Sequence, residues 1–154
     1  VRAVCTATLG ACEGALQAFI EIAKTRQVGP NKMKNDPYAR QLAAEVRASI
    51  EELKLTMGRN FDAMMESCRA GEPIPLDDRV RYRYDSAVVA DRCLGVSSRM
   101  LMAAGSGGIR QGSELLEFHL DMLASQAHVA NHSTPFANNM GGVMFGEENV
   151  DYAI

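Results

Sequence analysis

Polar side chains that could carry out chemistry recur along one stretch of the sequence. Glu117, Asp121, Ser125, His128 and His132 follow one another at steps of four, four, three and four residues. In an α-helix such steps place side chains on one face, one above another. A histidine ring exchanges its proton near neutral pH, so His128 could act as a general acid or base in a cleft lined by this face. A helix face that simply points to water has the same pattern, and the spacing alone does not separate the two interpretations.

The sequence predicts no metal site. A di-iron centre in a helical bundle needs Glu-x-x-His pairs, and none occurs here. The three histidines, His119 included, fall within one predicted helix, and the four cysteines lack the close spacing of zinc ligands. A phosphate-binding loop is also missing, and the run Gly-Ser-Gly-Gly follows a predicted helix rather than a strand, which argues against a dinucleotide fingerprint.

Four long amphipathic helices are predicted to position these residues. Apolar residues recur at three- and four-residue steps through most of the chain, and strand patterns are absent. Asp36 and Ser113 can cap helices, while Gly71 and the glycines that follow Ala104 can end them. We therefore expect an all-α fold, an up-and-down four-helix bundle within residues 1–133. Its helices are expected at about 1–26, 36–70, 77–104 and 113–133.

The last residues, 134–154, differ in kind from the rest. Seven glycine, asparagine and proline residues lie among phenylalanine, methionine and valine in this segment. It is too apolar for a free tail and too rich in glycine for a helix. We expect an irregular tail that docks on the bundle or on a neighbouring subunit.

Two further expectations concern packing. Gly95 lies inside the third predicted helix, where glycine costs roughly 1 kcal/mol relative to alanine, so a close helix contact is expected to compensate. The four cysteines, Cys5, Cys12, Cys68 and Cys93, are expected to be buried free thiols.

Composition limits the class of protein. The 154 residues are 47% hydrophobic and 23% charged, which suits one ordinary globular domain. With 16 basic and 19 acidic residues the net charge is −3, which gives no general attraction to nucleic acid or to an anionic membrane. No apolar run approaches the roughly 20 residues of a membrane span. We expect a cytoplasmic protein without nucleic-acid or membrane partners.

The segment from Leu101 to Ser133, LMAAGSGGIRQGSELLEFHLDMLASQAHVANHS, resembles the C-terminal bundle of the acyl-CoA dehydrogenase superfamily. There, a helix ends in a glycine-rich turn and the next helix carries an arginine–aspartate pair. The sequence is most similar to the flavin-dependent hydroxylase branch, the oxygenase components of two-component aromatic monooxygenases, in which a histidine follows the aspartate by seven residues, as His128 follows Asp121. The first two predicted helices resemble this branch as well. Leu120 and Glu117 stand where that branch has arginines, so the contacts of those arginines do not carry over.

The resemblance implies an oxygenase that hydroxylates a small phenolic substrate. In this branch reduced flavin, FMN with FAD as the alternative, reacts with O₂ to form a C4a-hydroperoxyflavin, and a separate flavin reductase supplies the reduced flavin. Such enzymes are usually homotetramers assembled through the bundle. They also have an N-terminal helical domain and a β-domain, which are absent here, so this part alone is expected to be inactive.

The resemblance also assigns residues. His128 corresponds to the histidine that takes or shares the proton of the phenol, and we expect Asp121, Ser125 and His132 in the substrate pocket. The flavin is expected to contact Arg26 and the glycine-rich turn formed by Gly105, Ser106, Gly107 and Gly108. Two alternatives stay open: an acyl-CoA dehydrogenase that oxidises a thioester with FAD, and a helical domain whose only task is oligomerisation. The segment VANHSTPF, which replaces the Glu-Gly-Thr-like stretch expected of a dehydrogenase, favours the oxygenase.

Overall fold

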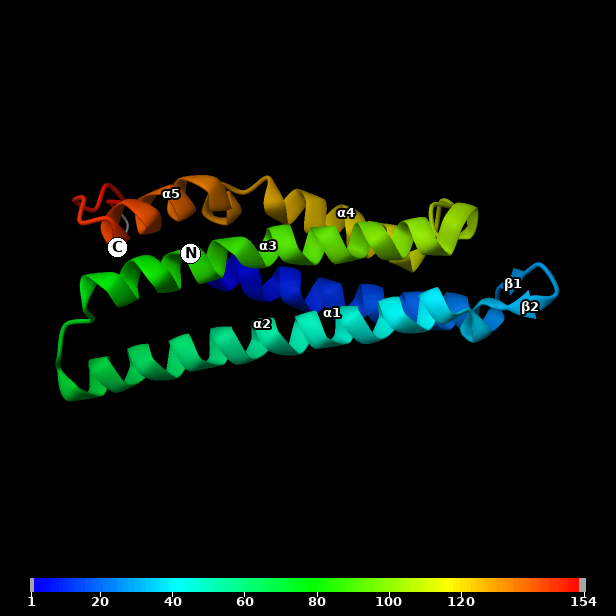
Figure 1. The fold of residues 1–154 in the computed structure, drawn as a ribbon, viewed down its shortest axis with the longest axis horizontal. Helices are drawn as coiled ribbons and strands as arrows, with labels where there is room; N and C mark the ends of the chain where they lie inside the picture. The colour runs from blue at the N-terminus through cyan, green and yellow to red at the C-terminus, as the bar shows by residue number, and fades with distance from the viewer. Residues whose placement is uncertain (1, 153–154) are drawn as a thin grey trace.

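Residues 2–152 fold into five helices and one short hairpin (Figure 1). The structure is a computed structural model that describes residues 2–152, so Val1 and the last two residues of the predicted tail lie outside it. The helices are α1 (Arg2–Thr25), α2 (Pro37–Ala70), α3 (Leu76–Ala104), α4 (Glu114–Gln126) and α5 (Ser133–Met144). The hairpin pairs β1 (Gln27–Val28) with β2 (Asn31–Lys32), and the single 3-10 turns are η1 (Met33–Asn35), η2 (Gly105–Gly107) and η3 (Val129–Asn131).

The helices form an up-and-down bundle, as predicted. α1, α2 and α3 run back and forth along the long axis, and α4 and α5 follow one another along α3 (Figure 1). α1 packs against α2, α3 and α4, while α5 packs against α3. The all-α fold is confirmed, with its fourth helix divided into two.

Local chemistry explains where α2 begins and ends. The Asp36 carboxylate accepts a hydrogen bond from the Ala39 N–H at 2.9 Å, and Pro37 occupies the first turn, where its missing N–H is not needed. At the other end Gly71 adopts φ +71°, a left-handed conformation that suits glycine. Both ends match the prediction.

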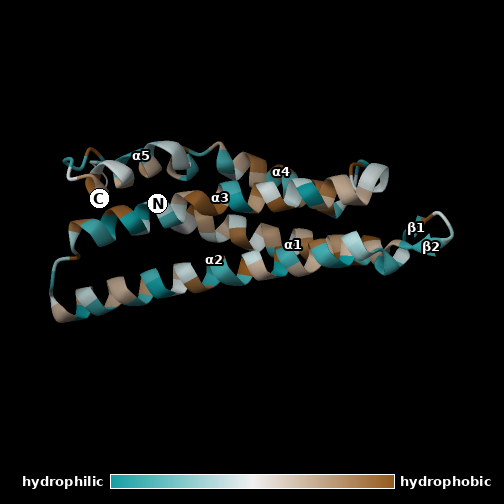
Figure 2. Ribbon diagram, viewed as in Figure 1, coloured by the Kyte–Doolittle hydropathy of each residue, from teal (hydrophilic) through white to brown (hydrophobic). Residues whose placement is uncertain are grey.

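The core lies between α1 and the inner faces of α2, α3 and α4, and hydrophobic residues alternate with hydrophilic ones along each long helix (Figure 2). α1 has 24 residues and α2 has 34, so the last turns of α2 have no α1 residue beside them. Cys68 lies there and is exposed, although the pattern placed it on the buried stripe and among the buried thiols. Phe61 of the same stripe is also exposed, although it lines a cavity together with Cys5 and Leu9 of α1. The other three cysteines are buried, as expected.

Residues 134–154 were predicted to be irregular because of their glycine content. This prediction is wrong for residues 134–144, which belong to α5 (Ser133–Met144). Gly141 and Gly142 occupy only its last turn, and packing of the helix on α3 offsets their low propensity. Residues 145–152 are irregular, with a turn at Gly146, and Asp151 among them pairs with Arg83 of α3.

Close helix contact occurs at Gly14 rather than at Gly95. A Cβ atom on Gly14 of α1 would lie 2.4 Å from Cζ of Phe118 on α4, so only glycine lets this ring approach. Gly95 is exposed, and a Cβ there would meet no atom within 4 Å. The compensation expected for Gly95 is therefore absent, because this residue faces solvent.

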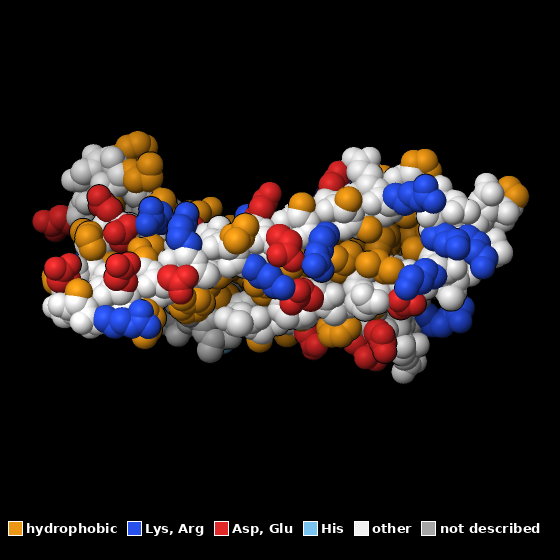
Figure 3. Space-filling view, turned by 90° about the horizontal axis from the view of Figure 1, so that it is seen from below, with side chains coloured by type: hydrophobic (Ala, Val, Ile, Leu, Met, Phe, Trp, Pro, Cys, Tyr) orange, Lys and Arg blue, Asp and Glu red, His pale blue; other side chains and the backbone are white. Residues whose placement is uncertain are grey.

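The surface seen from the α2 side carries basic and acidic side chains interspersed, with apolar atoms exposed between them (Figure 3). This distribution agrees with the small net charge of −3. Within residues 2–152 we find no helix with the length and hydrophobicity that a membrane span requires.

Candidate functional site

His128 and His132 lie in the connection between α4 and α5, not on α4. α4 ends at Gln126, and His132 is the residue immediately before α5. The predicted single helix face through both histidines is therefore wrong. Pro135 explains part of the break, because a proline ring clashes with the carbonyl group four residues earlier in a continuous helix. The Asn131 side chain adds to it by donating a hydrogen bond to the Ser125 carbonyl oxygen at 2.9 Å.

The His128 ring caps the short turn η3. Its Nδ1 accepts a hydrogen bond from the Ala130 N–H at 3.1 Å. A backbone N–H can only donate, so Nδ1 carries no proton, and in the neutral ring the proton is on Nε2. His128 therefore presents a hydrogen-bond donor at its outer nitrogen.

A cavity of about 400 Å³ between α1 and α4 brings together three of the predicted site residues, Asp121, Ser125 and His128. We call it the α1–α4 cavity. The rest of its lining is small or apolar: Val4, Ala7, Thr8, Ala11 and Ala124. The buried Thr8 hydroxyl shares a hydrogen bond with the Ser125 hydroxyl and donates to the Val4 carbonyl oxygen at 3.1 Å. Glu117 does not line this cavity.

A second cavity, of about 610 Å³, lies on the other side of His128, and we call it the α3–α5 cavity. His132 lines this cavity and not the α1–α4 cavity, so the predicted substrate-pocket residues are divided between the two. Val4 and His128 line both. Phe136 of α5 and Asn139, Val150 and Asp151 complete much of its wall.

Arg83 also lines the α3–α5 cavity, although the sequence indicated only a solvated charge or a bridge between helices at this position. Its side chain is only 10% exposed, and burial lowers the pKa of its guanidinium, although the Asp151 carboxylate opposes that shift. A signal was present in the sequence. Arg83 lies three residues after Val80 and four before Ala87, and both of these are buried, so all three share the inner face of α3.

Arg26 and the glycine-rich turn, predicted separately as cofactor contacts, lie side by side. Gly105 adopts φ +56°, and a Cβ atom there would lie 2.8 Å from Nη2 of Arg26. Among the residues that the structure describes, Nη1 of Arg26 is buried and has no hydrogen-bond partner. Gly108 also needs to be glycine, because a Cβ there would lie 2.6 Å from the Ala104 Cβ. Ser106 and Gly107 are exposed.

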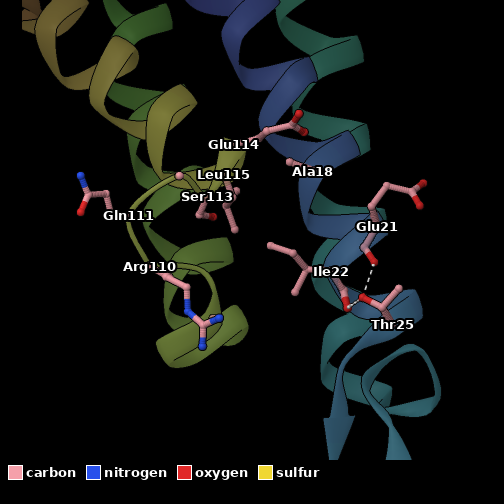
Figure 4. A pocket seen from close by; sticks show the side chains of 11 residues that line it. Ala18, Glu21, Ile22, Thr25, Arg110, Gln111, Ser113, Glu114 and Leu115 are labelled. Atoms are coloured by element: carbon pink, nitrogen blue, oxygen red, sulfur yellow. Dashed lines mark hydrogen bonds between the residues drawn. The ribbon is translucent and has the colours of Figure 1, made fainter.

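A third cavity, of about 410 Å³, opens beside this turn, between the end of α1 and the start of α4 (Figure 4). Glu21, Ile22 and Thr25 line it from α1, and Gly107 and Arg110 from the opposite side. The Thr25 hydroxyl donates its hydrogen bond within α1, to the backbone carbonyl oxygens of Glu21 and Ile22. In residues 2–152 no cluster of three or more His, Cys, Asp or Glu side chains could hold a metal ion.

Comparison with known proteins gives a family match and several relatives. Residues 3–133 match the family model described as acyl-CoA dehydrogenase, C-terminal domain. The chain is 26% identical over 126 residues to the flavin-dependent monooxygenase oxygenase subunit HsaA of Rhodococcus jostii, a match that covers 80% of this chain and 33% of that protein. The chain thus spans about a third of the length of this relative.

Solved structures share the fold. XiaF from Streptomyces, in complex with FADH₂ and glycerol, superimposes with a TM-score of 0.89 at 18% identity, over 97% of this chain and 39% of that one. Butyryl-CoA dehydrogenase from Megasphaera elsdenii gives a TM-score of 0.70 at 17% identity, over 94% of this chain and 35% of that one. The bundle therefore has the same fold as the corresponding part of both proteins.

Proposed function

Because the chain belongs to the acyl-CoA dehydrogenase C-terminal domain family, we propose that it forms the C-terminal part of a flavin-dependent monooxygenase that hydroxylates a small phenolic substrate. The observation that carries the proposal is the α1–α4 cavity, which Asp121, Ser125 and His128 line together. Asp121 and Ser125 are on α4, whereas His128 follows the end of this helix. The relatedness to an oxygenase subunit supports the same activity.

Reduced flavin, when bound, would supply the activated oxygen. Arg26 fits contact with an anionic group of such a cofactor, since its Nη1 is buried without a hydrogen-bond partner among the described residues. Gly105, against which the guanidinium packs, leaves the backbone open to close approach. Ser106, Gly107 and Gly108 complete the proposed contact. We infer reduced FMN as the cofactor, with FAD as the alternative that the FADH₂ complex of XiaF favours.

His128 is the proposed catalytic residue. With Nδ1 accepting the Ala130 N–H, the ring proton is on Nε2, so this nitrogen can donate a hydrogen bond to the oxygen of a bound phenol. A donor at this position favours the ionised phenol, whose ring is the better nucleophile toward an electrophilic oxygen. Asp121 and Ser125 then orient the substrate from the α1–α4 cavity, and His132 approaches from the α3–α5 cavity.

The proposed partners follow from the same activity. A flavin reductase would supply reduced flavin, since the relative is named as an oxygenase subunit. We also propose that the intact protein is a homotetramer assembled through this bundle, in the cytoplasm.

The test uses the intact protein mixed anaerobically with reduced FMN, or separately with FADH₂, and then with aerated buffer and a panel of phenols. The product is identified by mass spectrometry and the flavin is followed by absorbance. The decisive variant is His128→Asn, because asparagine can still accept the Ala130 N–H as a helix cap but has no atom at the Nε2 position. We expect hydroxylation to fall by about 10²-fold or more.

His119→Gln is the matched control, because His119 lines neither cavity beside His128 and should leave hydroxylation unchanged. If His128→Asn hydroxylates the substrate as fast as the wild type, His128 has no catalytic role. Bleaching of bound flavin by an acyl-CoA in the absence of oxygen would indicate a dehydrogenase instead. A helical domain used only for oligomerisation predicts that neither variant changes any activity.

A further inference from the structure

Arg83 is a buried cation that the proposed function does not use. It projects from α3 and contacts three other parts of the chain. Nη1 donates a hydrogen bond to the Ala130 carbonyl oxygen at 3.0 Å, and Cζ lies 3.4 Å from the centre of the Phe136 ring. Nε lies 3.5 Å from Oδ2 of Asp151, an ion pair in which both side chains are about one-tenth exposed.

Two hydrogen bonds connect Arg83 to His128 through a single residue. Arg83 binds the carbonyl oxygen of Ala130, and the N–H of Ala130 binds Nδ1 of His128 at 3.1 Å. Ala130 itself is buried, so water has little access to these two backbone groups. The polar atoms of this residue are thus held from opposite sides by a side chain of α3 and by the His128 ring.

We propose that Arg83 is a positioning residue that orients His128. Arg83 fixes the peptide that joins Ala130 to Asn131 and thereby restrains the Ala130 backbone, so that the N–H of Ala130 in the preceding peptide stays directed at Nδ1 of His128. This holds the ring in one orientation with its proton on Nε2. The proposal rests on the proposed function only in giving His128 a part in the reaction. The geometry of the ring can be measured without any turnover.

The helix break explains why a buried arginine is useful here. Where α4 ends, backbone carbonyl groups lose their helical partners and need other donors. An arginine can bind the Ala130 carbonyl oxygen, stack on Phe136 and pair with Asp151 at the same time, because its donors are arranged in a planar fork. Lysine lacks this fork, and an apolar side chain has no donor.

A competing explanation is that Arg83 only anchors the end of the chain through Asp151. The irregular segment after α5 is also held by Asn139, whose side chain accepts the Val150 N–H at 2.8 Å and donates to Asn149 Oδ1 at 2.9 Å. Asp151→Asn removes the ion pair and leaves the bond from Arg83 to Ala130 in place. This variant therefore separates anchoring of the segment from positioning of His128.

The experiment records ¹⁵N NMR spectra of histidine-labelled intact protein at about pH 9, where an ordinary histidine ring is neutral. The wild type should show distinct shifts for the two ring nitrogens of His128, with the proton on Nε2. In Arg83→Met/Asp151→Asn, which removes the donor to Ala130 and leaves no unpaired buried charge, the two shifts should converge as the tautomers mix. Asp151→Asn alone should keep the wild-type pattern, as should Arg92→Gln at the exposed face of α3.

Hydroxylation should fall by about ten- to a hundredfold in the double variant, mainly through kcat, since a misplaced group slows the chemical step. Arg83→Lys, which keeps the charge beside Asp151, gives a second measurement and should also mix the tautomers. A single Nε2–H tautomer in a folded Arg83→Lys or double variant would overturn the proposal. If the wild-type protein hydroxylates none of the phenols while the NMR spectra behave as expected, the proposed function is rejected. The role of Arg83 in positioning the His128 ring then still holds.

Discussion

His119 differs from the two histidines of the α4–α5 connection because its ring packs between α3 and α4. Nδ1 lies 2.8 Å from the Ser97 hydroxyl oxygen, and burial lowers the pKa of His119. The folded protein therefore binds fewer protons at this site than the unfolded chain, whose histidines titrate near 6.5. The free energy of unfolding should decrease as pH falls through and below about 6.5.

His119→Gln should flatten this dependence, because glutamine can keep a hydrogen bond to Ser97 and does not titrate. Urea unfolding at several values between about pH 5 and 8 measures the slope. His132→Gln, a substitution at an exposed position, is the control and should leave the slope as in the wild type. Equal slopes for wild type and His119→Gln would contradict the assignment.

At the level of single residues, the sequence could predict only those site contacts that depend on one continuous helix. Asp121 and Ser125 are one helical turn apart and line the same cavity, as their spacing indicates. The positions of His128 and His132 could not be predicted, because the polar pattern continues across a break made by Pro135 and by the bond from Asn131 to Ser125. Arg83 was interpreted as a solvated or bundle-bridging charge because arginine is seldom buried, although its spacing from Val80 and Ala87 places it on the inner face of α3.

At the level of helix pairs, contact between α1 and α4 depends on Gly14. Gly14→Ala adds a Cβ that would lie 2.4 Å from Cζ of Phe118, so the ring must move. We expect a loss of about 1–2 kcal/mol in the free energy of unfolding, the cost of overpacking less the gain in helix propensity. Gly10→Ala, one turn earlier in the same helix, meets nothing within 4 Å and should stabilise by about 0.5–1 kcal/mol.

Urea unfolding of Gly14→Ala and Gly10→Ala measures both changes in the free energy of unfolding. Phe118→Leu combined with Gly14→Ala should recover part of the lost stability relative to Gly14→Ala alone, since leucine lacks the ring atoms that clash. A Gly14→Ala variant as stable as Gly10→Ala would show that the Phe118 ring moves without cost.

Helix ends were predictable where a single side chain or a glycine decides them. Asp36 and Gly71 bound α2 through contacts within a few residues, so local sequence suffices. α5 was not predictable in this way, because its glycines oppose a helix and packing against α3 reverses the outcome. The end of the buried stripe on α2 could not be predicted either, since it depends on how far α1 reaches beside it.

At the scale of the whole molecule, α4 carries two neighbouring leucines that the described residues leave half-exposed. Leu120 and Leu123 lie three residues apart on one face and are 50% and 47% exposed. If the proposed tetramer forms through the bundle, this face is where α4 can meet a second copy. Each leucine is already half-buried, so an interface that covers the rest of it contributes about 1 kcal/mol, and two-fold symmetry repeats every contact.

Leu120→Gln combined with Leu123→Gln should therefore shift the intact protein toward smaller species, with dissociation at concentrations at least tenfold higher than for the wild type. Sedimentation velocity over a range of concentrations measures the shift. Leu55→Gln on α2 is the matched control, since Leu55 is 73% exposed and lies on another helix. If the double variant keeps the wild-type assembly, the interface uses another face of the bundle. If Leu55→Gln dissociates the protein instead, α2 provides that face, and the outer side of α4 is left to contact the rest of the enzyme.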